Sequence, residues 1–194
     1  MSNSTAADVD LVGDETAGNI ARAALFAALM GAFSYVSFPY PLSPAPVTLQ
    51  VLGVFLAGLF LGPLWGGASM VLYLLSGAIG APVFAGGSAG IGVLLGPTGG
   101  YLFSYAVAAV VVGVIAHGGL RVRSLAETPV VRMLAGMIAA TVVIYGIGVP
   151  FLWWNLDMTL RTAVITGAVV FVPAEAAKMA AAVGIVRSDA IRAE

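Results

Sequence analysis

The chain has no cysteine, a single lysine and few charges of either sign, since charged residues make up 9% of its 194 residues. Without cysteine it can form neither disulfides nor thiolate metal sites. Because its only lysine is Lys178, it has no Walker loop for nucleotide phosphates, so ATP-driven work would need a separate subunit. A net charge of -1 without clustered Lys and Arg argues against a nucleic-acid partner. No motif indicates a metal or a cofactor.

Apolar residues are abundant instead: they make up 60% of the chain, and the mean hydropathy is +1.04. A soluble domain carries about 25% charged residues, so we expect lipid to surround most of this chain. The apolar runs between helix breakers predict an all-α integral membrane protein with six transmembrane helices. These helices are expected over residues 20–38, 48–61, 64–79, 99–117, 129–152 and 173–186.

The arginines predict the orientation of the chain in the membrane. All but Arg161 flank one set of predicted helix ends, and positive residues concentrate in cytoplasmic loops. Both termini of this multi-pass plasma-membrane protein are therefore expected in the cytoplasm. Residues 1–19 contain acidic but no basic residues and predict a disordered acidic tail. Residues 20–194 should form one six-helix transmembrane substrate-binding domain, whose first helix is retained because no convincing cleavage site follows it.

Three of the predicted helices, 48–61, 64–79 and 173–186, are shorter than the roughly 20 residues that cross a bilayer. The outer connectors 39–47, 80–98 and 153–172 must then fill the missing depth, and the first two are uncharged and rich in Gly and Pro. Irregular backbone at membrane depth is tolerated only where protein covers it or where it lines a cavity. We therefore expect a pocket open to the outside, with tight packing of small residues as the alternative.

Two opposite charges lie inside the last apolar run, in the segment PAEAAK at 173–178. Pro173 suits the first position of a helix, and Glu175 and Lys178, three residues apart, then share one helix face. Each charge costs about 2.5 to 3.5 kcal/mol at the bilayer centre, so an intramembrane pair favours a binding site for a polar ligand. The alternative is a structural pair whose charges only neutralise each other.

Ser88 lies in a G-x-S-x-G pattern at 86–90, but the strand-turn-helix context of a nucleophile elbow is missing. The lone histidine, His117, is expected about 28 Å away, at the far end of the next helix. An intramembrane serine hydrolase built on Ser88 is the competing enzymatic hypothesis.

Three further features have simple interpretations. Asp157 and Arg161, four residues apart, are interpreted as a surface ion pair. Trp153 and Trp154 are expected at the outer membrane interface. Small-xxx-small spacing in the first helix suits either internal packing or the docking of another helix, and it involves Ala23, Ala24, Ala27, Ala28 and Ala32.

Several motifs in a fixed order resemble those of one family. They are PVTLQ at 46–50, GP at 62–63, GAPVFAGGS at 80–88, LGPTGGY at 95–101 and FVPAEAAK at 171–178. The chain resembles the biotin-specific S components, the BioY family of energy-coupling-factor transporters. The resemblance implies an S-component-like fold, whose Gly/Pro-rich outer loops close over biotin. It also implies an alanine-rich first helix that docks a transmembrane coupling (T) component, and two cytoplasmic ATPases that energise import. The chain would then be a transporter subunit and not an enzyme.

The same resemblance implies which residues contact biotin: Gln50, Ser88, Tyr101, Glu175 and Lys178. The sequence departs from the family pattern at three places. Pro-Ala-Glu-x-x-Lys replaces the usual Pro-Gly-Asp-x-x-Lys, and some members have Asn where Ser88 stands and Arg where Leu102 stands. A similar scaffold for another vitamin, such as thiamine or riboflavin, is the alternative of the same class.

Overall fold

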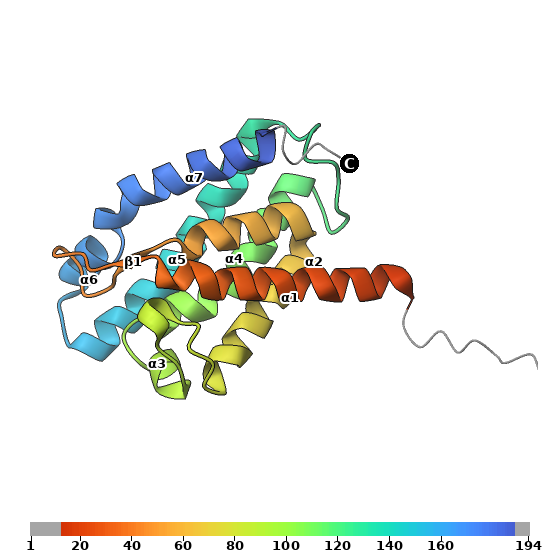
Figure 1. Ribbon diagram of the computed structural model, residues 1–194. Helices are drawn as coiled ribbons and strands as arrows, with labels where there is room; N and C mark the ends of the chain where they lie inside the picture. Colours follow the sequence, from red (N-terminus) through yellow and green to blue (C-terminus); the bar gives the residue numbers. More distant parts are fainter. Residues whose placement is uncertain (1–12, 189–194) are drawn as a thin grey trace, which may run out of the picture.

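The computed structural model describes residues 13–188, which are mostly helical (Figure 1). Within this range the helices are α1 (Asp14–Tyr35), α2 (Gln50–Ala78), α3 (Ile91–Leu95), α4 (Gly99–His117), α5 (Val130–Leu156), α6 (Leu160–Gly167) and α7 (Val172–Arg187). Two 3₁₀ turns, η1 (Ala85–Gly87) and η2 (Val169–Phe171), precede α3 and α7 respectively. Five of the described stretches are long and apolar enough to cross a membrane: α1, α2, α4, α5 and the segment 160–187.

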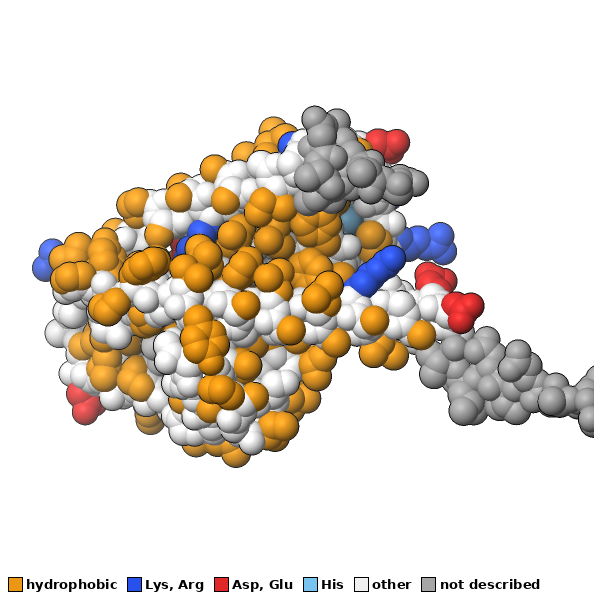
Figure 2. Space-filling view, in the orientation of Figure 1, with side chains coloured by type: hydrophobic (Ala, Val, Ile, Leu, Met, Phe, Trp, Pro, Cys, Tyr) orange, Lys and Arg blue, Asp and Glu red, His pale blue; other side chains and the backbone are white. Residues whose placement is uncertain are grey.

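The outer surface of the helices is apolar, which is expected of a multi-pass membrane protein. Large hydrophobic side chains such as Trp154, Val131 and Leu25 are 82%, 77% and 67% exposed. Figure 2 shows apolar side chains over most of one face, with the charged side chains mainly at its right-hand end. Such a surface is stable in contact with lipid hydrocarbon when the backbone N–H and C=O groups are hydrogen-bonded within the helices.

The predicted helices 48–61 and 64–79 form one bent element, α2. Gly62 lies outside helical geometry, with φ 72° and ψ -174°, and it is followed by Pro63. The two halves then pack closely, because a Cβ on Gly66 would lie 2.8 Å from the carbonyl oxygen of Ala57. Pro63 has no N–H to donate to the carbonyl of Leu59, and Nε2 of His117 lies 2.8 Å from that oxygen instead. A side chain from α4 thus provides the hydrogen-bond partner that the carbonyl at the bend would otherwise lack.

Helix α4 forms the centre of the fold and packs against α2 on one side and α5 on the other. Helix α1 covers α2, and α7 contacts both α2 and α5. The buried core between these helices contains Met30, Met70, Met133 and Met137, all fully inaccessible. Methionine suits irregular gaps between helices, because it is unbranched and flexible.

The start of α1, the connector 118–129 and the end of α7 lie at one end of the molecule (Figure 1). Arg187 donates hydrogen bonds to the carbonyls of Ala126 and Thr128, at 2.8 and 2.6 Å. The backbone N–H of Arg123 donates to Nδ1 of His117 at 3.1 Å, which joins the connector to the end of α4. The other connectors, including α3 and α6, lie at the opposite end (Figure 1).

The described residues are mostly helical, as predicted, and the exception is a short antiparallel pair formed by β1 (Ser37–Phe38) and β2 (Val47–Thr48). Ser37 pairs with Thr48, and Phe38 with Val47. The connector between them is rich in proline and cannot form a helix, so its flanking backbone groups find partners across a two-stranded ladder. This hairpin leads directly into α2.

Several helix boundaries differ from the prediction. Helix α1 begins at Asp14, before the expected start at residue 20, and its first turn carries Asp14 and Glu15, which complement the positive end of the helix dipole. The rest of the predicted tail, residues 1–12, lies outside the described residues. Helix α5 continues to Leu156, and α6 occupies part of the expected connector 153–172. The last helix matches its prediction, with Pro173 in the first turn.

Candidate functional site

A cavity of about 220 Å³ lies where the connectors 39–47, 80–98 and 153–172 meet the helices. This is somewhat below the roughly 300 to 1,000 Å³ of pockets for drug-sized ligands, so it suits a small molecule. Ser88 is the exposed residue of its lining and therefore marks the rim. The lining consists of Ala45, Pro46, Val47, Thr48, Gln50, Val51, Phe84, Ala85, Ser88, Val93, Thr98, Tyr101, Leu102, Tyr105, Ile144, Tyr145, Phe171, Glu175 and Lys178.

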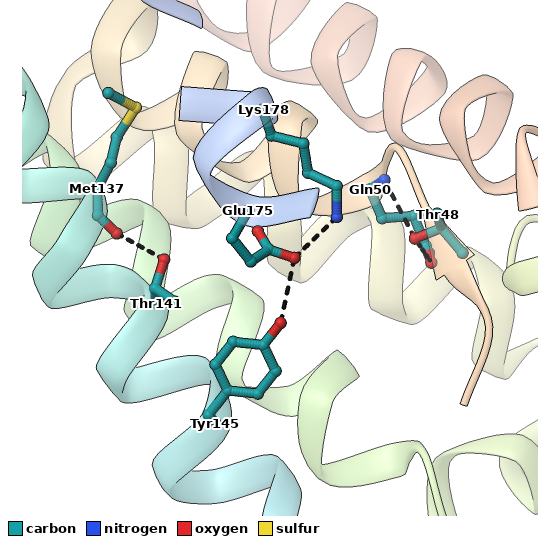
Figure 3. A network of polar contacts seen from close by, with 7 residues as sticks. All are labelled: Thr48, Gln50, Met137, Thr141, Tyr145, Glu175 and Lys178. Carbon is teal, nitrogen blue, oxygen red and sulfur yellow. Dashed lines mark hydrogen bonds and ion pairs between the residues drawn. The ribbon is translucent and has the colours of Figure 1, made fainter. Parts of the chain in front are cut away.

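The first turns of α7 carry a buried ion pair into this cavity (Figure 3). Nζ of Lys178 donates to Oε1 of Glu175 at 2.8 Å, and the two residues are 7% and 3% exposed. Helix α7 has 16 residues and so spans about 24 Å, less than the roughly 30 Å of hydrocarbon. A helix of this length can begin within the membrane. Glu175 and Lys178, in its first turns, can then lie inside the hydrocarbon layer and still line the cavity.

The carboxylate of Glu175 is only half satisfied. The hydroxyl of Tyr145, on α5, donates to the same Oε1 at 3.1 Å, so two donors converge on one oxygen. Oε2 is buried and has no hydrogen-bond partner among the described residues. A buried carboxylate oxygen without a donor is costly, since a hydrogen bond to a charged group contributes about 1.5 to 3 kcal/mol. The site is therefore prepared to accept an N–H or O–H from a ligand.

Gln50, the first residue of α2, belongs to a second polar network. Its Oε1 accepts from the hydroxyl of Thr48 at 3.0 Å, and its Nε2 donates to the hydroxyl of Tyr73. The hydroxyl of Thr48 in turn accepts from the backbone N–H of Gln50 at 3.3 Å. Gln50 is 2% exposed, so these contacts fix its orientation at the cavity wall.

Aromatic side chains form one wall of the cavity. The rings of Tyr145 and Phe171 stack with centroids 6.3 Å apart, and Tyr101 meets Tyr145 edge to face at 6.1 Å. The hydroxyl of Tyr101 donates to the carbonyl of Gly167 at 2.8 Å. Because the hydroxyl is used in this bond, Tyr101 would contact a ligand through its aromatic ring. Tyr40, from the β1–β2 connector, packs on Phe171 at 5.7 Å. The β1–β2 connector and η2 thereby meet beside the same cavity.

Ser88 shows no contact expected of a catalytic nucleophile. Its hydroxyl donates to the carbonyl of Ala85 at 2.9 Å, within the Gly-rich loop. Both ring nitrogens of His117 bond to backbone groups at the other end of α4, as described above. His117 is therefore not available to Ser88 as a base.

All five residues expected to bind the ligand, Gln50, Ser88, Tyr101, Glu175 and Lys178, line this one cavity. They come from α2, the Gly-rich loop, α4 and α7. Their contact with a ligand stays a prediction. Sequence reasoning missed Tyr145, Thr48 and Phe171. A tyrosine in the middle of an apolar span, away from the interface where tyrosines gather, was the available signal for Tyr145.

The remaining sequence features have no part in the cavity lining. Asp157 and Arg161 are both exposed, as expected, but they form no ion pair among the described residues, because Asp157 ends α5 with φ 47° and Arg161 begins a separate helix. Trp153 and Trp154 are exposed near the C-terminal end of α5. Within residues 13–188 no three His, Cys, Asp or Glu side chains form a group that could hold a metal ion.

Comparisons with known proteins agree on one family. The model of the BioY family matches residues 3–193. The biotin transporter BioY of Thermotoga maritima is 37% identical over 151 residues, covering 78% of this chain and 83% of that protein. The probable biotin transporter BioY of Pyrococcus horikoshii is 38% identical over 167 residues, covering 86% and 93%. The crystal structure of an S-component for biotin from an ECF-type ABC transporter has the same fold, with a TM-score of 0.82, 24% identity and coverage of 94% and 95%.

Proposed function

This chain belongs to the BioY family, and from that premise we propose that it is the biotin-binding membrane subunit of a vitamin uptake transporter. It captures biotin from outside the cell, and partner subunits drive import. The observation that carries the proposal is a mostly apolar cavity whose lining contains one buried ion pair and one carboxylate oxygen that has no hydrogen-bond partner among the described residues.

The chemistry of biotin complements these groups. Its ureido ring offers N–H donors beside a carbonyl oxygen, the fused sulfur ring is apolar, and the tail ends in a carboxylate. A ureido N–H can donate to Oε2 of Glu175, which has no other donor among the described residues. The ureido oxygen can accept from Lys178, whose ammonium has three donors and uses one of them on Glu175. The aromatic wall then faces the sulfur ring.

In this proposal Tyr145 positions the carboxylate, because it bonds to the same oxygen as Lys178. The two donors hold the group so that Oε2 remains for the ligand. Gln50, Tyr101 and Ser88 contact biotin from α2, α4 and the Gly-rich loop, respectively. These assignments agree with their places in the cavity lining.

We further propose six crossings, with both termini in the cytoplasm. The halves of α2 on either side of Gly62 count as separate spans and join α1, α4, α5 and α7. The Gly62 bend lies near the arginine-bearing connector, since a Cβ on Gly62 would meet the side chain of Val122. Arg121, Arg123, Arg132 and Arg187 belong to this end of the molecule, which supports a cytoplasmic location by the positive-inside rule. The cavity then opens outward.

The partners proposed are a transmembrane coupling (T) component and two cytoplasmic ATPases, as in an ECF-type transporter. Helix α1 has some alanines that are buried within this chain and others that are exposed, and the exposed ones support a docking role for this helix. Ala23 and Ala27 are buried, whereas Ala24, Ala28 and Ala32 are exposed along one face. Small residues at four-residue spacing allow another transmembrane helix to approach closely.

Equilibrium binding of labelled biotin to the purified full-length protein tests the proposal. We expect saturable binding and a thermal stabilisation by biotin, with no shift from thiamine or riboflavin, because a ligand stabilises only the folded state that it binds. A shift with another vitamin and none with biotin would assign the scaffold to that vitamin. A serine-directed fluorophosphonate should leave the protein unlabelled, whereas labelling lost in Ser88→Ala would support the hydrolase.

A further inference from the structure

The cavity contains one cation and one anion, and each neutralises the other. Among its lining residues only Glu175 and Lys178 carry charge, and they are paired at 2.8 Å. Leu102, which is 4% exposed, occupies part of the wall with an apolar side chain. The described site therefore has no unpaired cation for the carboxylate at the end of the biotin tail.

The geometry around the pair also disfavours an anion there. A carboxylate placed on Lys178 would lie beside Oε2 of Glu175, which is buried and has no hydrogen-bond donor within residues 13–188. Like charges repel more strongly in a buried site than in water. A neutral head with adjacent N–H and C=O groups satisfies both residues without this repulsion, so the head lies at this buried pair.

The tail must then extend toward the rim, where the polar groups are hydroxyls. Ser88 is exposed at the rim, and Thr98 lies on the wall at the start of α4. A hydroxyl can either donate or accept, so it can bond to a carboxylate, an amide or an ester. Such groups distinguish the tail's charge poorly.

We propose that this site recognises the uncharged ureido head and is indifferent to the charge of the tail, so that biotin amides and esters are ligands as well as biotin. The proposal rests on biotin binding as proposed above. It extends the ligand class to tail-modified forms of the vitamin.

Competition against labelled biotin, on the full-length protein in lipid nanodiscs, tests this directly. Biotinamide and biotin methyl ester change only the tail, and we expect each to bind within tenfold of biotin. 2-Iminobiotin changes only the head, replacing the ureido oxygen that Lys178 requires, and we expect it to bind more than tenfold weaker. A charge-assisted contact normally contributes at least tenfold, so a loss above tenfold for the amide and the ester would overturn the proposal.

Glu175→Gln provides a second readout that does not depend on absolute affinity. If the tail carboxylate lies far from residue 175, biotin and biotinamide should weaken by the same factor in this variant. A selective gain for biotin over biotinamide would place the carboxylate beside Glu175 and overturn the proposal. Failure of biotin itself to bind the parent protein would instead count against the proposed function, so the two failures are distinguishable.

Discussion

Replacing Glu175 by Gln should weaken biotin binding while keeping the size of the side chain. In the parent protein Oε1 accepts hydrogen bonds from Lys178 and Tyr145, whereas Oε2 has no donor in the described part of the chain and can accept one from the ligand. The amide oxygen of Gln can replace Oε1, but its NH₂ group then faces the ligand's N–H with a second donor. Losing a hydrogen bond to a charged acceptor costs about 1.5 to 3 kcal/mol of binding free energy. At about 1.4 kcal/mol per factor of ten, the Kd for biotin should rise roughly 10- to 100-fold.

The same substitution should also lower stability without ligand. Lys178 is 7% exposed and would lose its only carboxylate partner among the described residues. Breaking a buried pair by removing one partner commonly costs about 3 to 5 kcal/mol, because the other charge remains buried and uncompensated. The thermal midpoint of the unliganded protein, measured in detergent, should therefore fall.

Two matched variants separate the effect on binding from the effect on folding. Glu175→Gln combined with Lys178→Met removes both charges and should recover much of the lost stability, while biotin binding stays weakened. Asp157→Asn makes the same acid-to-amide change at an exposed position outside the cavity, and Asn tolerates the positive φ found there. It should change neither property.

Titration calorimetry of the folded variants decides the question. If Glu175→Gln remains folded and binds biotin within about threefold of the parent, the carboxylate does not accept a hydrogen bond from the ligand. The assignment of the head to α7 would then be wrong, although the family and the fold would stand.

Three other variants test separate parts of the structure. Tyr145→Phe removes one donor to Glu175 and should raise the Kd for biotin about 3- to 30-fold with little change in thermal stability; an unchanged Kd would remove its positioning role. His117→Phe keeps an aromatic ring but leaves the carbonyl of Leu59 and the backbone N–H of Arg123 without their side-chain partner, so the free energy of unfolding should fall by about 1 to 3 kcal/mol. An unaltered thermal midpoint would contradict this account. Ala28→Trp places a large side chain on the exposed face of α1, so it should prevent co-purification with the coupling component while biotin still binds. The control is Val131→Trp, which makes a similar enlargement on the exposed surface of α5. Equal effects of the two variants would argue against docking through α1.

Local patterns in the sequence were sufficient for most of the helices. The bend in α2 follows from Gly62 and Pro63, because proline has no N–H to continue a helix. The start of the last helix follows from Pro173, and the three-residue spacing brings Glu175 and Lys178 onto one face. The start of α1 and the end of α5 were less predictable. Acidic residues, as at the start of α1, and a proline, as near the end of α5, can lie either inside a helix or in the adjoining connector.

The amino-acid sequence by itself determined that lipid is the solvent, roughly where the membrane helices lie and which two charges lie inside them, because hydropathy, proline and residue spacing act over one or two helical turns. Only the tertiary structure decided that Tyr145 bonds to Glu175, that Gln50 bonds to Tyr73 and that Oε2 of Glu175 has no donor among the residues that the structure describes. A helix that is apolar on every side carries no pattern that marks its inner face, so its partners depend on how the helices pack. Hydrogen bonds between α5 and α7, or across the bend of α2, exist only once that packing is formed.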